Sequence, residues 1–192
     1  MKQYQFVTTW FLETTPEAVF DALLHSESWP DWWRGVTRVE ELERGDADGL
    51  GNVRRYTFRS LLPYSLTFQM RSTLIDPPSV LAGDASGDLV GRGRWSLTPA
   101  EGGVTVRYDW QVATTREWMN VLAPITGPIF VWNHDLVMRW GEEGLRGHLG
   151  LPPRVEDDDR ARTRRRRLAI AGGLAVAAFA TLRSWRRRKA GA

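Results

Sequence analysis

Strict alternation of hydrophobic and polar residues marks the middle of the chain. In residues 104–112, VTVRYDWQV, every second side chain is hydrophobic, and residues 66–74, LTFQMRSTL, show the same pattern. A repeat of two places one set of side chains on each face of a β-strand. Weaker alternation occurs at 36–42, 53–60, 80–86 and 89–97, and turn-forming stretches such as ERGDADGLG and PAEGG separate these segments. With a β-branched and aromatic segment at 4–12, the pattern predicts about seven strands in an antiparallel meander.

Helical periodicity flanks this strand-rich region on both sides. Thr14 or Thr15 can cap a first helix, Pro16 suits its first turn, and a short second helix is expected around 29–33. A long C-terminal helix is expected within 118–149, with its regular part beginning near Pro128. Its two apolar rows are Ile129, Trp132, Leu136 and Trp140, and Val137, Gly141 and Leu145.

The C-terminal helix has to bury these rows against another apolar surface. The concave face of the predicted sheet is the surface large enough to receive them. We therefore predict an α+β fold over residues 1–150, in which a curved, seven-stranded antiparallel sheet wraps around the long helix with a cavity between them.

Composition supports a packed domain and narrows its chemistry. Hydrophobic residues make up 42% of the chain and include ten tryptophans, which predicts a substantial core. The absence of cysteine excludes disulfides and thiolate chemistry. His25, His134 and His148 lie far apart in the sequence, so we expect no metal site, and no cofactor is expected either. The N-terminus lacks the apolar core of a signal peptide, which predicts a cytoplasmic domain.

The net charge of +3 conceals two oppositely charged regions. Residues 1–153 carry 14 Lys and Arg against 19 Asp and Glu, a net charge of −5, whereas residues 154–192 carry 12 against 4, a net charge of +8. The high isoelectric point therefore belongs to the tail, and an acidic main domain is a poor candidate for binding nucleic acid. The oligomeric state stays open.

The tail has three parts with different compositions. Residues 151–167 form a charged linker, residues 168–182 are uncharged and apolar on every side, and residues 183–192 are basic. A helix of fifteen residues spans about 22 Å against a hydrocarbon core of about 30 Å, so a membrane span is marginal unless the flanking arginines extend it. Basic residues within 164–189 favour contact with anionic lipid headgroups. A disordered tail and a helix docked on a partner remain alternatives.

Four longer phrases resemble one superfamily. They are TTPEAVFDALLHSESWPDWWRGV, GLGNVRRYTFRSLLPYSLTFQM, GDLVGRGRWSLTPAEGGVTVRYDWQV and WNHDLVMRWGEEGLRGHL. In this order they are similar to the START-like, or SRPBCC, superfamily, which includes polyketide cyclases, plant pathogenesis-related proteins and lipid-transfer domains. The resemblance covers Gln3 to about Leu149 and implies the helix-grip architecture, a sheet curled around the last helix with a cavity between. Because the superfamily contains binders, transporters and enzymes, it indicates fold more strongly than activity.

Alternation identifies the side chains that would line this cavity. The candidate ligand-binding residues are Tyr56, Phe58, Phe68, Met70, Gly91, Gly93, Trp95, Tyr108, Trp110, Trp132 and Leu136. Plain core packing is the alternative for each of them. Collectively an aromatic lining is typical of ligand pockets, and Gly91 and Gly93 are expected to leave room for a guest.

Few polar residues are expected to face inward. They are Arg54, Ser72, the hydroxyls of Tyr56 and Tyr108, and Asn133 or His134. A buried arginine needs a partner, so Arg54 is expected to reach solvent at the sheet edge in preference to meeting an acidic group or a ligand oxygen. His134 and Asp135 are neighbours on a helix and should not form an orienting pair.

Three functions remain open at this stage. The first is a carrier or sensor of a small hydrophobic molecule such as a lipid, quinone or polyketide, held at a membrane by the tail. The second is an enzyme of the polyketide cyclase or dehydratase type, with Arg54, Tyr108 or His134 as catalytic candidates. The third is an adaptor whose basic tail binds nucleic acid or an acidic protein.

Overall fold

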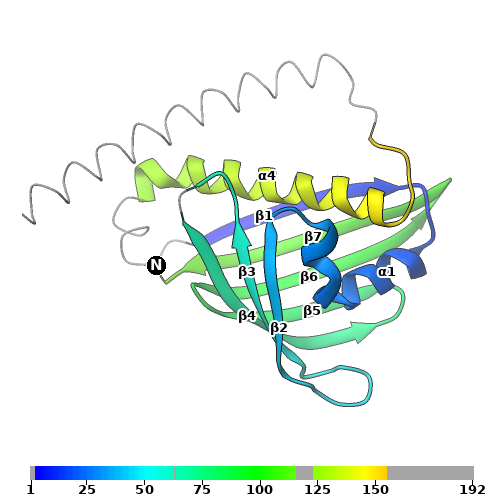
Figure 1. Ribbon diagram of the computed structural model, residues 1–192, viewed down its shortest axis with the longest axis horizontal. Coiled ribbons are helices and arrows are strands. Elements are labelled where there is room, and N and C mark those ends of the chain that lie inside the picture. The colour runs from blue at the N-terminus through cyan, green and yellow to red at the C-terminus, as the bar shows by residue number, and fades with distance from the viewer. Residues whose placement is uncertain (1–2, 63, 116–122, 155–192) are drawn as a thin grey trace, which may run out of the picture.

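Seven strands form one curved antiparallel sheet in a computed structural model of the protein, which describes residues 3–62, 64–115 and 123–154 (Figure 1). The strands are β1 (Gln3–Leu12), β2 (Val36–Glu43), β3 (Val53–Arg59), β4 (Ser65–Asp76), β5 (Val80–Gly87), β6 (Leu89–Ala100) and β7 (Gly103–Thr114). Their order across the sheet is β1-β7-β6-β5-β4-β3-β2. Strands β2 to β7 are thus a meander, and β1 pairs with β7 to complete it, as the alternation predicted.

The helices lie where the sequence placed them, with one difference in length. They are α1 (Pro16–Leu24), the 3₁₀ turn η1 (Ser26–Ser28), α2 (Trp29–Trp32) and α4 (Ala123–His148). The hydroxyl of Thr15 caps α1 by accepting a 3.3 Å hydrogen bond from the Ala18 amide. Helix α4 begins at Ala123, before the start expected near Pro128. Pro124 falls in its first turn, where a missing amide hydrogen interrupts no helical bond.

Helix α4 lies along the sheet and packs against α2 near its C-terminal half (Figure 1). The Trp33 indole, only 2% exposed, donates a 2.8 Å hydrogen bond from Nε1 to the Val137 carbonyl. Gly141 faces the same ring so closely that a Cβ there would lie 2.5 Å from Trp33 Cε2, and a Cβ on Gly144 would collide with the Trp32 carbonyl oxygen. Glycines in α4 therefore let α2 approach the helix.

The C-terminal end of α4 is tied to β1 by a buried arginine. Arg146 pairs with Glu13 at 2.8 Å and donates hydrogen bonds to the carbonyls of Phe11 and Pro152. Glu142 pairs with Arg154 at 2.8 Å. These contacts fix the end of the helix and the first residues after it against the sheet.

Most of the predicted tail lies outside the described residues. This applies to the linker after residue 154, the apolar segment 168–182, the basic segment 183–192 and the candidate membrane-binding region 164–189. Within the ranges that the structure describes, no helix is both long and apolar enough to cross a bilayer.

Candidate ligand cavity

A cavity of about 480 Å³ separates the sheet from the helices. Its walls come from strands β2 to β7, from the end of α1, η1 and α2, from the middle of α4, and from the loop between β2 and β3. Protein interiors are normally packed without voids much larger than a water molecule. A space of this size lies in the range of small-molecule pockets.

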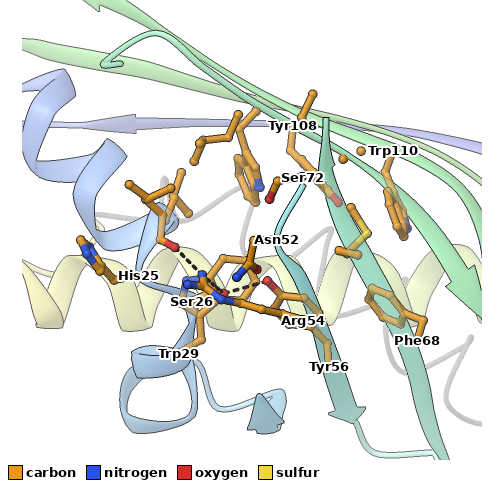
Figure 2. A pocket seen from close by; sticks show the side chains of 18 of the residues that line it. His25, Ser26, Trp29, Asn52, Arg54, Tyr56, Phe68, Ser72, Tyr108 and Trp110 are labelled. Atoms are coloured by element: carbon orange, nitrogen blue, oxygen red, sulfur yellow. Dashed lines mark hydrogen bonds between the residues drawn. The ribbon is translucent and has the colours of Figure 1, made fainter. Parts of the chain in front are cut away.

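Aromatic side chains from neighbouring strands form the sheet wall. Antiparallel register places Tyr56 opposite Phe68, and their rings stack 5.9 Å apart. Trp95 and Tyr108 face each other across β6 and β7 with ring centroids 4.1 Å apart. The cavity lining contains these four of the candidates predicted from alternation, together with Phe58, Met70, Gly93 and Trp110. Figure 2 shows several of these side chains around the space.

The two glycine candidates do not create free volume. Gly91 is absent from the cavity lining, and a Cβ there would collide with the backbone carbonyl of Gln111 in β7. A Cβ on Gly93 would lie 2.6 Å from the Tyr108 hydroxyl and 2.9 Å from the Trp110 ring. Both glycines thus admit a close neighbour, backbone for Gly91 and aromatic rings for Gly93. The expectation that they leave room for a guest is wrong.

Helix α4 presents a different row to the cavity from the one expected. The lining residues of α4 are Phe130, Asn133, His134, Val137 and Met138. Trp132 instead packs beside Leu62 and Ile129, and Leu136 is buried outside the cavity. The prediction that Trp132 and Leu136 line the cavity is therefore corrected. Apolar character alone selected the wrong row because this helix is apolar on more than one side.

Arg54 anchors a polar cluster near the β2–β3 loop (Figure 2). Its Nη1 donates hydrogen bonds to the Leu24 carbonyl at 2.7 Å and the Ser26 hydroxyl at 3.0 Å. Its Nη2 lies 3.3 Å from Glu27 and 3.8 Å from Glu41. The Ser26 and Tyr56 hydroxyls share a 2.7 Å hydrogen bond. Arg54 meets acidic groups instead of reaching solvent at the sheet edge, because β2 continues the sheet beyond β3 and η1 supplies Glu27.

Loop residues complete this end of the cavity. We call the region formed by Ser26, Asn52, Arg54, Arg44 and residues 46–49 the loop end. Asn52 Nδ2 donates to Glu41 Oε2 at 2.9 Å and to the Arg44 carbonyl at 3.2 Å, which holds the loop against β2. Apart from Arg54, sequence reasoning missed these residues. Periodicity carries no signal for a contact that a loop makes.

Both cavity tyrosines stay protonated over a wide pH range. Burial raises the pKa of the Tyr56 phenol, and the hydrogen bond shared with Ser26 and the nearby Arg54 only partly oppose this increase. Burial raises the pKa of Tyr108 far above its ordinary value, and the neighbouring Tyr56 adds to the effect. Each phenol is therefore suited to donate a hydrogen bond and unsuited to act as a base near neutral pH.

Asn133 and His134 bring unpaired polar atoms to the opposite end. Strand β3 leaves the loop at Val53 and reaches Arg59 opposite Ser65, so Leu66 lies at the far end of this strand pair. There, His134 stacks on Phe6 with ring centroids 4.0 Å apart. Among the described residues, Asn133 Oδ1 and both ring nitrogens of His134 are buried without a hydrogen-bond partner. We call the region of Leu66, Leu89, Trp110, Phe130, Asn133 and His134 the α4 end.

His134 has no orienting carboxylate at hydrogen-bond distance. Its Nδ1 lies 3.6 Å from Asp135 Oδ1, which is too long for a hydrogen bond, and the Asp135 side chain is exposed. No group of three or more His, Asp or Glu residues in the described ranges could hold a metal ion.

A family model described as polyketide cyclase / dehydrase and lipid transport matches residues 4–150. The chain belongs to this family. No curated protein matches the chain.

Several solved structures share the fold of this family member. A protein from Thermus thermophilus has 14% identity and a TM-score of 0.60, over 76% of this chain and 99% of that one. The di-domain ARO/CYC protein StfQ, from the steffimycin biosynthetic pathway, has 14% identity and a TM-score of 0.58 over 78% of this chain and 52% of that one. The chain thus spans about half the length of StfQ. Similarity at these identities establishes the helix-grip fold alone.

The family member's cavity presents a few polar groups among its aromatic walls. No serine, threonine or lysine in the described lining is bonded to a general base, so nucleophilic catalysis has no visible machinery there. Neutral phenols and an amide can orient a substrate through hydrogen bonds, and an imidazole can in addition donate or accept a proton. Family membership and the cavity together support a ligand-binding helix-grip protein.

Proposed function

We propose that the chain binds a small hydrophobic molecule, such as a lipid, a quinone or a polyketide-like compound, and acts as its carrier or sensor. The observation that carries the proposal is the cavity of about 480 Å³ with its continuous aromatic wall. Burying an apolar guest there removes apolar surface of both partners from water, which stabilises the complex by about 25 cal/mol per Å². The family description, which includes lipid transport, is consistent with such a role.

Native mass spectrometry of the purified chain tests the proposal directly. We expect an additional mass that disappears on denaturation and that can be extracted and identified. The neutral fluorophore N-phenylnaphthylamine should bind to ligand-stripped protein, and Met70→Trp should weaken its binding because the indole would enter the cavity. Gln69→Trp is the matched control, since Gln69 precedes Met70 on β4, is absent from the lining and belongs to the other face of the strand. Absence of both a co-purified mass and probe binding would refute the proposal.

A polyketide cyclase or dehydratase activity is the second candidate function. It is favoured by His134, a cavity-lining residue whose ring nitrogens are buried without a hydrogen-bond partner among the described residues. In this reading His134 moves a proton, Tyr108 donates a hydrogen bond to the substrate, and Arg54 positions the cluster at the loop end. His134→Ala should then abolish turnover of a cavity-bound substrate while ligand binding survives. Unchanged turnover in this variant would exclude His134 as a catalytic residue.

Membrane attachment through residues 164–189 is a further part of the proposal. Its support is the sequence, in which Leu168–Leu182 is apolar and has arginine clusters on both sides. Truncation after residue 167 should move the protein out of the membrane fraction of cells that express it. An unchanged distribution between the fractions would show that these residues do not attach the chain.

A further inference from the structure

The two ends of the cavity differ in whether their polar groups already have partners. At the loop end, Arg54 is shared among the Leu24 carbonyl, the Ser26 hydroxyl and two carboxylates. The Tyr56 hydroxyl is bonded to Ser26. These groups satisfy one another, so a ligand gains little by placing a polar atom beside them.

At the α4 end the polar groups have no such partners. Asn133 is 8% exposed, and its Oδ1 makes no hydrogen bond to any residue that the structure describes. Both ring nitrogens of His134 are likewise buried without a hydrogen bond to any described residue, and the His134 side chain is only 11% exposed. Buried polar atoms are almost always paired, with protein, water or ligand. Two adjacent cavity-lining residues that both break this rule indicate where a bound molecule has its polar group.

The chemistry of these atoms restricts that group. An amide oxygen only accepts, whereas a neutral imidazole donates from one nitrogen and accepts at the other. A hydroxyl can donate to one of these groups and accept from the other, whereas a hydrocarbon can do neither. A carboxylate only accepts, so it would face Asn133 Oδ1 unfavourably.

Charge disfavours an anionic ligand still further. The carboxylates and guanidinium groups in the lining belong to Glu41, Arg44, Asp46, Asp48 and Arg54, all on β2, β3 or the loop between them. None of the Lys or Arg side chains in the described lining lies at the α4 end. A buried anion there would lose its hydration without gaining a counter-charge from a lysine or arginine.

We propose that the ligand is a neutral apolar molecule carrying a hydroxyl, and that this hydroxyl binds Asn133 and His134 at the α4 end while the apolar body lies along the aromatic wall. This inference rests on the proposed binding function and specifies the ligand class for the same cavity. It also sets the orientation, with the hydroxyl remote from the loop end.

A thermodynamic cycle with matched probes tests the inference. Dissociation constants are measured for naphthol, methylnaphthalene and naphthoate, which share a ring system, with the native chain and with Asn133→Leu and His134→Phe. The phenylalanine ring retains the stacking on Phe6. Comparing the naphthol to methylnaphthalene ratio between proteins cancels the cost of dehydrating the hydroxyl. Glu143→Gln, an exposed change on the same helix, is the matched control.

The native chain should favour naphthol over methylnaphthalene by about ten-fold more than either variant does, the value of one hydrogen bond. Naphthoate should bind most weakly, and Glu143→Gln should behave like the native chain. A ratio that changes by less than about two-fold in both variants would overturn the inference. Tighter binding of naphthoate than of naphthol would overturn it as well. If none of the three probes binds although N-phenylnaphthylamine does, the inference is overturned while the proposed function stands; if N-phenylnaphthylamine fails as well and no mass co-purifies, the proposed function fails and the inference falls with it.

Discussion

Replacing Gly141 with alanine should weaken the contact that seats α4 on α2. The added Cβ would lie 2.5 Å from Cε2 and 2.6 Å from Cζ2 of Trp33, far inside the optimal carbon–carbon separation of about 3.5–4.0 Å. The Trp33 indole cannot easily move away from the added Cβ. Its ring lies 4.9 Å from that of Trp29, and its Nε1 is bonded to the Val137 carbonyl.

The expected magnitude follows from three contributions to the free energy of unfolding. Forcing an extra carbon into a packed core costs about 1–3 kcal/mol. Displacement of the indole also endangers its hydrogen bond to Val137, which contributes about 1 kcal/mol. Alanine offsets about 1 kcal/mol of this loss because it is a better helix former than glycine. We therefore expect Gly141→Ala to lower the free energy of unfolding by about 1–3 kcal/mol.

Gly147 supplies the matched control on the same helix. A Cβ there meets no atom within 4 Å, so Gly147→Ala should stabilise the protein by up to about 1 kcal/mol through helix propensity alone. Urea unfolding followed by far-ultraviolet circular dichroism measures both variants. The two substitutions should shift the midpoint in opposite directions. A midpoint for Gly141→Ala equal to or above that of the native chain would refute the described packing of α4 on Trp33.

Two further predictions concern pH. The hydrogen bond from Arg146 lowers the pKa of Glu13, so this pair stabilises the folded state above the ordinary glutamate pKa of 4.5 and loses its effect as the pH falls through the lowered value. The stability deficit of Glu13→Gln in urea unfolding should accordingly be present near neutral pH and shrink in acid; a deficit that grows in acid would contradict this. Burial raises the pKa of Tyr108 above its ordinary value of 10.0, so the neutral phenol stabilises the fold below that pH and the benefit is lost as the pH rises beyond it. Native protein should therefore lose more stability than Tyr108→Phe above about pH 10, and equal losses would count against a buried Tyr108 phenol.

The β-sheet side of the cavity could be read from the sequence because a repeat of two fixes the face of every residue. Once Trp95 and Tyr108 are assigned inward, their neighbours two positions away must follow, and Gly93 and Trp110 do line the cavity. Gly91 is the exception, because a carbonyl of β7 occupies the position where its side chain would lie. Alternation predicts the face of a residue and contains no information on how closely the next strand approaches it.

The helical side was less predictable. In a helix that is apolar on several sides, periodicity does not show which side faces the sheet. That choice depends on the residues that contact each side, and these residues lie far away in the sequence. Trp132 packs beside Leu62, from the β3–β4 loop, whereas the Val137 carbonyl accepts a hydrogen bond from the indole of Trp33. The pairing of Arg54 with Glu27 and Glu41 likewise depends on how η1 docks beside β3, which local pattern does not contain.

Helix α4 both packs tightly against α2 and lines the cavity, whereas a sequence pattern assigns a buried position to only one of these roles. Toward its C-terminal half, Gly141 and the fully buried Leu145 pack tightly, and the helix is gripped by α2. About two to three turns earlier, Asn133 and His134 line the cavity, where a well-packed core would place apolar residues. Places where buried positions break the packing rule are expected to be functional sites, since stability alone would not retain them. The tight half of the helix holds the polar half in position, so the cavity persists beside a core that is otherwise closely packed.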